Sequence, residues 1–324
     1  MKTKLILAAM ILGSATMYAA GLKTGQISNV TKVTADRSMR YESPVWSPDG
    51  AMIAFTGEGY DGLYVMQANG KNVKKVSADT GVGYGFRWSA DSREVLVRDT
   101  RWLTEADGSS KRVHAAWAIE VSNGTRVRMS QDLELMSPAA WSYTPSGKKS
   151  VICEAKAVAN RLPAVPMQAM TMAKQVQTLD PMPEVSFVED YENLYVLTAD
   201  GNKRLLNRGA SFNAQLSPDG KKVVFNEMDN IVVINIDGTG KRVLGIGFRP
   251  QWVGNSQIVY ERTTDNGHSY LTGELYILNI NGGAEKALTN SRDRIEMYPS
   301  ISPDGNKIAF VSNTDGQIYV ADLK

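Results

Sequence analysis

Cysteine and histidine are scarce in this chain of 324 residues, and neither sign of charge predominates. The single cysteine, Cys153, excludes an intramolecular disulfide, and its place in a short apolar run favours a buried hydrophobic role. Two histidines, His114 and His268, are too few for a metal site built on several imidazoles. A net charge of +2 at pH 7 gives no reason to expect nucleic acid or an anionic membrane surface as a partner.

Long apolar runs are also missing, and the longest, near the N-terminus, is too short to cross a bilayer. It follows two lysines, Lys2 and Lys4, and precedes several small residues, which is the pattern of a secretory signal peptide. We expect residues 1–20 to be cleaved and the mature protein, residues 21–324, to be periplasmic or secreted without an integral membrane segment. A disordered start or a first core strand is the alternative.

The motifs of common catalytic classes are absent as well. There is no Gly-x-Ser-x-Gly nucleophile elbow. A phosphate-loop ending at Gly147–Ser150 would need a leading glycine where Ser142 stands. The acidic group Glu189, Asp190 and Glu192 is typical of a solvated loop, although it could assist acid–base chemistry. We therefore expect a non-catalytic protein with no cofactor and no bound metal.

What the sequence does contain is a repeated turn. Ser-Pro-Asp-Gly occurs at Ser47–Gly50, Ser217–Gly220 and Ser302–Gly305, each time before a short apolar run. Proline and aspartate suit the two central positions of a tight turn, and glycine accepts the left-handed conformation that closes it. A turn that recurs in this way indicates one supersecondary unit used repeatedly.

Six segments align on this turn. We call the residue directly before the turn serine, or its equivalent, the frame position; these residues are Trp46, Trp88, Trp141, Leu216, Trp252 and Ile301. Each turn is followed by an apolar strand, a further strand, an Asn-Gly or Asp-Gly type turn and a more polar strand. The sequence therefore predicts an all-β fold, a six-bladed β-propeller of four-stranded antiparallel blades.

Two irregularities modify this plan. The sixth unit ends after its third strand at Lys324, whereas Ile27 to Thr34 forms a strand that belongs to no unit, so we expect this N-terminal strand to complete the last blade and close the ring. The wide gap between the third and fourth units holds a methionine- and proline-rich insertion at about residues 155–190. We expect it to cover one face, with a short helix at Met167 to Gln177.

On these residues the chain resembles the TolB-like propellers, whose repeat is called PD40. The resemblance is carried by the three Ser-Pro-Asp-Gly turns with their apolar runs Ile53–Phe55, Val223–Phe225 and Ile308–Phe310. It covers nearly the whole mature sequence and implies a periplasmic propeller that binds or scaffolds other envelope components. In TolB itself an α/β domain precedes the propeller, and we expect that domain to be missing here because strand material begins almost directly after the signal peptide.

The candidate binding residues lie at one mouth of the predicted channel. An aromatic residue recurs four to five positions before the frame position, often beside an arginine, and long connections open on the same face. Stacking and bidentate hydrogen bonds from such residues suit a peptide segment or a glycan, although each aromatic could instead pack between blades. The candidates are Tyr84, Phe86, Arg98, Trp102, Phe248, Arg249, His268 and Tyr298.

These observations favour a secreted, non-catalytic and monomeric propeller that binds a protein or peptide partner in the cell envelope. The alternatives are a carbohydrate-active hydrolase or lyase on the same scaffold, with carboxylates or His268 at the channel mouth, and a structural subunit of a cell-surface assembly. The scarcity of histidine and of paired carboxylates at equivalent blade positions favours binding over catalysis.

Overall fold

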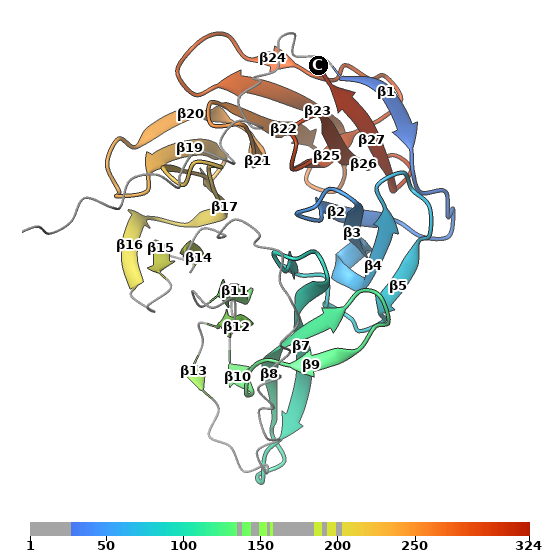
Figure 1. Ribbon diagram of the computed structural model, residues 1–324, viewed down its shortest axis with the longest axis vertical. Helices are drawn as coiled ribbons and strands as arrows, with labels where there is room; N and C mark the ends of the chain where they lie inside the picture. Colours follow the sequence, from blue (N-terminus) through green and yellow to red (C-terminus); the bar gives the residue numbers. More distant parts are fainter. Residues whose placement is uncertain are drawn as a thin grey trace, which may run out of the picture.

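The computed structural model describes residues 27–134, 138–143, 149–153, 156–157, 185–189, 193–198 and 203–324. In these residues the secondary structure consists of strands β1 to β27 and one 3-10 helix, η1 (Glu58–Tyr60). The strands form antiparallel sheets that are arranged in a ring around a common axis (Figure 1). The protein is therefore an all-β propeller, as the repeat predicts.

Five sheets contain four or more strands, and we call them blades I to V. Blade I consists of β2 (Tyr41–Trp46), β3 (Met52–Gly57), β4 (Asp61–Gln67) and β5 (Lys74–Ser77). Blade II consists of β6 (Arg87–Trp88), β7 (Glu94–Thr104), β8 (Ser110–Glu120), β9 (Arg126–Arg128), β10 (Leu133–Glu134) and β13 (Lys156–Ala157). Blade III consists of β17 (Ser211–Leu216), β18 (Lys222–Glu227), β19 (Asn230–Asn235) and β20 (Arg242–Ile246). Blade IV consists of β21 (Phe248–Val253), β22 (Gln257–Asp265), β23 (Tyr270–Asn279) and β24 (Lys286–Ala287). Blade V consists of β25 (Glu296–Ile301), β26 (Lys307–Ser312), β27 (Gln317–Leu323) and β1 (Ile27–Lys32).

The prediction of six four-stranded blades is not confirmed, because the third expected unit is divided between two smaller sheets. One is the hairpin of β11 (Ala140–Tyr143) and β12 (Lys149–Ile152); the other consists of β14 (Val185–Glu189), β15 (Asn193–Thr198) and β16 (Lys203–Arg208). Along the whole of its length β14 pairs with β15, from Val185 opposite Thr198 to Glu189 opposite Leu194. This pairing occupies the edge of β15 that β12 was expected to use, so the end of the predicted insertion is a sheet strand.

The Ser-Pro-Asp-Gly turns have the predicted geometry. In the first, the Gly50 N–H donates to the Ser47 carbonyl at 2.9 Å, and Gly50 has a left-handed φ of 71°. The Ser47 hydroxyl donates to the Asp49 carboxylate at 2.6 Å, which in turn accepts the Ala51 N–H at 3.0 Å. The same serine–aspartate bond recurs in the other two copies and in the degraded turn of blade II. These polar side chains are thus used within the turn itself.

The apolar runs after the turns are buried on both faces of their blades. Ile53, Ala54 and Phe55 of β3 are fully buried. Ile53 and Phe55 pack in a cluster with blade V, whereas Ala54 packs in a cluster with blade II. Similar clusters join blade IV to blade V and blade III to blade IV, so the core is a series of layers between neighbouring blades.

Four frame tryptophans tie blades I, II and IV and the β11–β12 hairpin to the blade that precedes each of them in the ring. Trp88 of blade II donates its indole N–H to the Val45 carbonyl of blade I at 3.0 Å. The bond recurs at Trp46, Trp141 and Trp252, in each case to the residue directly before the preceding frame position: Ser300, Arg87 and Gln215. Because the indole is large and carries one donor, it both fills the space between blades and satisfies a carbonyl of the innermost strand.

The predicted closure of the ring is confirmed. Strand β1 pairs antiparallel with β27, from Ile27 opposite Leu323 to Lys32 opposite Tyr319. Beyond the strand, the Thr34 hydroxyl accepts the Ile318 N–H at 2.9 Å. The N-terminal strand therefore covers the outer edge of blade V, which would otherwise be open.

The predicted signal peptide and the helix expected at Met167 to Gln177 lie outside the described residues. Within the described ranges, no helix is long and apolar enough to cross a membrane.

Candidate functional site

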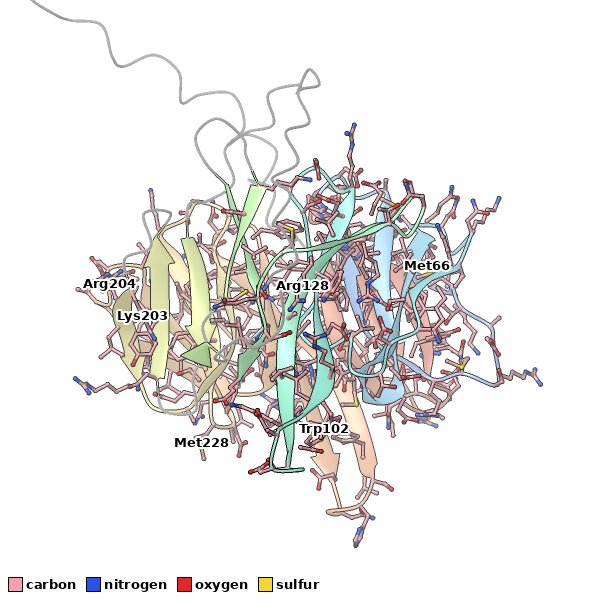
Figure 2. All side chains as sticks on the ribbon, turned by 90° about the horizontal axis from the view of Figure 1, so that it is seen from below. Met66, Trp102, Arg128, Lys203, Arg204 and Met228 are labelled. Atoms are coloured by element: carbon pink, nitrogen blue, oxygen red, sulfur yellow. The ribbon has the colours of Figure 1, made fainter. Side chains whose placement is uncertain are left out.

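The two ends of the ring carry different kinds of connection. The Ser-Pro-Asp-Gly turns join the first and second strands of a blade, and we call their side the turn end. The connections between second and third strands lie at the opposite side, the connection end, and of those that the structure describes in full the β7–β8 and β22–β23 hairpins have the longest strands. Trp102 and Met228 both lie at the connection end in the side view of Figure 2. Most of the predicted binding residues belong to this end.

A β-bulge recurs in the innermost strand of four blades, three residues before the frame position. The bulged residues Ser43, Asn213, Arg249 and Tyr298 have left-handed φ angles of 53°, 57°, 50° and 56°. The strand register shifts at each of these points. Such a conformation is unfavourable for arginine and tyrosine, and bulges of this kind redirect a side chain at functional sites.

Arg249 and Tyr298 lie together and share a buried carboxylate. The Arg249 guanidinium lies over the Tyr298 ring, 4.0 Å from its centre. Glu261 of β22 is fully buried and accepts hydrogen bonds from Arg249 Nη1 and from the Tyr298 backbone N–H. One carboxylate therefore fixes both the arginine of blade IV and the bulge of blade V.

A second carboxylate extends this network to blade I. Glu42 accepts a hydrogen bond from the Tyr298 hydroxyl at 3.0 Å and from the Tyr60 N–H at 2.9 Å. The Tyr60 ring meets Tyr84 edge-on, with 5.3 Å between ring centres, and the Arg98 guanidinium lies 4.4 Å from the centre of the Tyr84 ring. We call these seven residues the aromatic mouth: Glu42, Tyr60, Tyr84, Arg98, Arg249, Glu261 and Tyr298.

Tyr298 and Tyr60 of the aromatic mouth keep their hydroxyl protons at neutral pH. Burial raises the pKa of Tyr298 well above its usual range against the opposing charge of Arg249, and the Glu42 carboxylate adds to the rise. Burial and then Glu42 raise the pKa of Tyr60 in the same way. Burial also raises the pKa of Glu261, which the Arg249 guanidinium and the Tyr298 N–H oppose.

The structure brings together four of the predicted residues, Tyr84, Arg98, Arg249 and Tyr298, and places the others differently. Phe86 does not reach the mouth, because it is buried in the layer between blades I and II. Phe248 is partly buried opposite Glu261. Trp102 and His268 are exposed on the two long hairpins, and Trp102 is 67% exposed.

Sequence reasoning missed Glu42 and Tyr60. Glu42 stands four residues before its frame position, where blades II to V have Tyr84, Phe212, Phe248 and Met297. A carboxylate at a position that is otherwise apolar was a usable signal. Tyr60 lies in the short η1 connection, for which the repeat offers no equivalent.

Several large apolar side chains are exposed at the connection end around the aromatic mouth. Trp102 and Met228 are the most exposed, at 67% and 68%. Others come from the start of β17, from β23 and from the connection that enters β6: Phe212, Tyr270, Leu271 and Tyr84. Large apolar groups gathered on one face mark an interaction surface.

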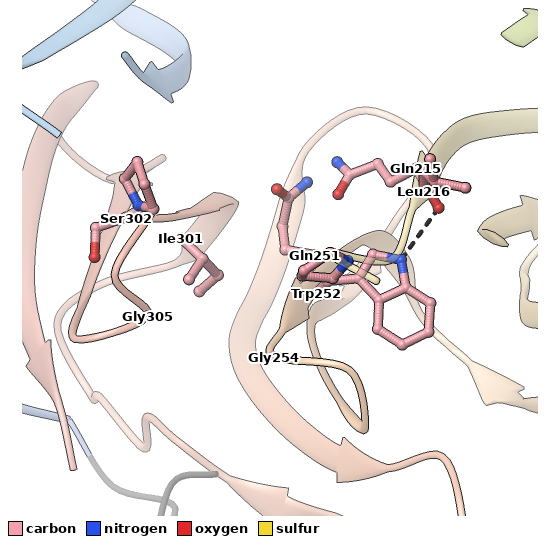
Figure 3. Close-up of a pocket in the computed structure, with 10 residues that line it drawn as sticks. Gln215, Leu216, Gln251, Trp252, Gly254, Ile301, Ser302 and Gly305 are labelled. Atoms are coloured by element: carbon pink, nitrogen blue, oxygen red, sulfur yellow. Dashed lines mark hydrogen bonds between the residues drawn. The ribbon is translucent and has the colours of Figure 1, made fainter. Parts of the chain in front are cut away.

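A pocket of about 310 Å³ lies at the turn end, between blades III, IV and V. The carboxamides of Gln215 and Gln251 lie on one side of it, and Ile301 and Ser302 lie on the other (Figure 3). The residues that line this pocket are uncharged. None of the predicted binding residues lines this pocket, which shows that the turn end also has a concave surface.

The few candidate metal or nucleophile side chains are dispersed. In the described part of the chain, no three histidine, cysteine or acidic side chains are grouped so as to hold a metal ion. Burial, with Arg98 and Arg112 nearby, lowers the pKa of His114 to about 4, so this histidine is neutral at pH 7. Burial raises the pKa of Cys153 to about 11, and the thiol packs in the apolar cluster beyond blade II.

Comparison with solved structures supports the class of protein that the sheets define. A structure from Agrobacterium tumefaciens assigned as a TolB aligns with 88% of this chain and 91% of its own, at 17% identity and a TM-score of 0.51. The β-propeller domain of Cps50 (Swd1) from Myceliophteria thermophila aligns with 92% of this chain and 99% of its own, at 13% identity and a TM-score of 0.54. Both likenesses show the propeller fold.

Sequence comparison also finds a TolB homologue. A TolB homologue from Chlorobium luteolum is 26% identical over 151 residues, a match that covers 43% of this chain and 33% of that protein. This chain thus matches about a third of the length of that relative. No family model matches the chain. The resemblance to TolB-like propellers, first indicated by the Ser-Pro-Asp-Gly repeat, is confirmed by a relative in sequence and a relative in structure.

Proposed function

We propose that this protein is a secreted, non-catalytic TolB-like propeller that binds a protein or peptide partner in the cell envelope, at the connection end of its ring. The N-terminal pattern of a signal peptide and the resemblance to TolB-like propellers support the periplasmic location. Binding of a partner is itself proposed here, because the similarity to the TolB homologue covers only part of that protein.

The observation that carries the proposal is the exposure of large apolar side chains from separate connections on one end of the ring. Trp102, Met228 and Tyr270 come from blades II, III and IV. None of them supports the core, and tryptophan, tyrosine and methionine are enriched in protein interfaces. Contact with a polypeptide partner best accounts for the exposure of these three side chains at one end of the ring.

The aromatic mouth gives such an interface a rigid floor. Its side chains are held by hydrogen bonds and ring contacts across blades I, II, IV and V, so their geometry is set before a partner arrives. Preorganised contact groups lose less conformational entropy on binding.

The geometry gives less support to a hydrolase or lyase. Of the two carboxylates in the aromatic mouth, Glu261 is fully buried and already accepts two hydrogen bonds, and both oxygens of Glu42 accept hydrogen bonds from Tyr298 and Tyr60. A general acid or base needs a proton position that reaches the substrate. These carboxylates serve the scaffold instead.

Site-specific photocrosslinking in the native envelope tests the proposal. A photoreactive amino acid replaces Trp102 at the connection end, and a matched variant carries it at Val73, which is exposed at the other end of blade I. We expect a discrete protein adduct from position 102 that position 73 does not form. A glycan panel with the purified protein runs in parallel, and a saccharide hit without a protein adduct would contradict the proposal.

Binding measurements with the captured partner then locate the contact. Trp102→Ala and Tyr270→Ala are expected to weaken binding about tenfold or more each, as loss of a central aromatic contact does, whereas Val73→Ala should stay within about twofold. Equal affinities for all three variants would contradict partner binding at the connection end.

A further inference from the structure

Three buried polar side chains form a row across blade V, each with an oxygen that no protein group satisfies. The residues are Glu296 on β25, Ser312 on β26 and Gln317 on β27, and all three are at least 98% buried. The oxygens that have no hydrogen-bond partner are Glu296 Oε2, Ser312 Oγ and Gln317 Oε1. A buried polar oxygen without a partner is destabilising, so three in one place call for an explanation.

The sheet register places these side chains together. Glu296 is directly opposite Ser312, and Ser312 is directly opposite Gln317. Residues directly opposite each other in an antiparallel sheet project from the same face, with Cβ atoms about 4.5–5.5 Å apart. The short serine therefore stands between two longer side chains, and the three unpaired oxygens belong to neighbouring positions on adjacent strands.

The other polar atoms of the row are already engaged. Glu296 Oε1 accepts hydrogen bonds from the Ser291 hydroxyl and from Arg294 Nε. Gln317 Nε2 donates to the carbonyls of Asp36 and Met39, at 2.9 Å and 2.8 Å. The three remaining oxygens are therefore two acceptors, on Glu296 and Gln317, and one hydroxyl that can donate.

We propose that this row is the binding site of one internal water molecule. The water donates one hydrogen bond to Glu296 Oε2 and one to Gln317 Oε1, and it accepts the hydroxyl proton of Ser312. Three hydrogen bonds to otherwise unsatisfied groups are the usual coordination of a buried water. A divalent cation fits less well, because Arg294 already places a positive charge beside the same carboxylate.

The site lies where the ring closes. Gln317 begins β27, the strand that β1 covers, and its amide holds two carbonyls of the segment between β1 and β2. The water thus links the three strands β25, β26 and β27 of blade V and, through Gln317, the connection from the closing strand to blade I. Its role is structural, in stabilising the closed ring, and it has no part in the proposed partner binding.

A high-resolution crystal structure of the mature protein tests the proposal. We expect one solvent peak about 2.6–3.2 Å from each of the three oxygens. Shorter contacts near about 2.3–2.5 Å, with an anomalous signal after calcium soaking, would show a cation and overturn it. A direct contact between Glu296 and Ser312 with no peak would overturn it as well.

A pair of variants provides a second readout in solution. Ser312→Ala removes a bond to the water, and we expect a fall in Tm of about 2–4 °C. Ser28→Ala is the matched control, because the Ser28 hydroxyl on β1 is also buried and unpaired but has no row of unpaired oxygens opposite it. The control should leave Tm within about 1 °C, and equal shifts in the two variants would contradict the water site.

Discussion

Replacement of a frame tryptophan by phenylalanine isolates the hydrogen bond that links neighbouring blades. Trp88→Phe keeps an aromatic ring between blades I and II but removes the indole N–H that donates to the Val45 carbonyl at 3.0 Å. That carbonyl is then left without its buried donor, which costs about 1–3 kcal/mol, and the smaller ring adds about 1 kcal/mol of lost packing. We expect a total loss of about 2–4 kcal/mol in the free energy of unfolding.

Urea denaturation followed by far-UV circular dichroism measures this loss, because tryptophan fluorescence would itself change with the substitution. Trp102→Phe is the matched control, since Trp102 is exposed and donates no hydrogen bond between blades; its effect should stay within about 0.5 kcal/mol. The m-value should be unchanged in both variants. If Trp88→Phe costs no more than Trp102→Phe, the hydrogen bonds between blades do not stabilise the ring as argued.

Three further predictions concern pH, closure and packing. Because the folded pKa of His114 is about 4, below its unfolded value of 6.5, stability should fall by up to about 3 kcal/mol as the pH drops from 6.5 to 4. His114→Gln should flatten this slope in pH-dependent urea melts, and an unchanged slope would contradict the assignment. Deletion of Gly316–Lys324 removes β27 with four buried apolar side chains, a loss comparable with the whole stability of a domain, so circular dichroism should show an unfolded chain; a cooperative, near-native melt would contradict the closure. Gly83→Ala would place a Cβ 2.1 Å from the buried Thr56 hydroxyl, and thermal melts should show a loss of about 1–3 kcal/mol that Thr56→Ala partly relieves.

Local chemistry explains why most of the fold was predictable. The Ser-Pro-Asp-Gly turns depend on bonds within five consecutive residues, such as Ser47 to Asp49, so their geometry follows from the tetrapeptide itself. The continuous apolar runs, such as Ile53–Phe55, predicted strands covered on both faces, and the unassigned strand before blade I predicted the closure. The predicted number of blades was wrong because the expected pairing of β12 with β15 joins distant parts of the chain. Strand β15 instead pairs with its neighbour along the chain, β14, which was not predicted to be a strand.

The candidate site was predictable only in part. Arg249 and Tyr298 were found because they recur near the frame position, but a sequence position does not say which face a side chain takes. Arg249 and Tyr298 occupy bulge positions and lie against each other, whereas Phe86, one position nearer to its frame residue, packs between blades. Glu261 could not be assigned its role, since it acts on residues of two blades that are 12 and 37 positions away along the chain.

Turn chemistry, strand periodicity and the recurrence of tryptophan are local properties, and from them the chain itself specified a closed propeller with two unlike ends. The partners of each side chain across neighbouring blades are not local. The tryptophan-to-carbonyl bonds, the shared carboxylates of the aromatic mouth and the row of oxygens in blade V arise only when blades from distant parts of the sequence pack face to face. The repeat therefore predicts the scaffold, whereas the site depends on how the blades pack when the ring closes.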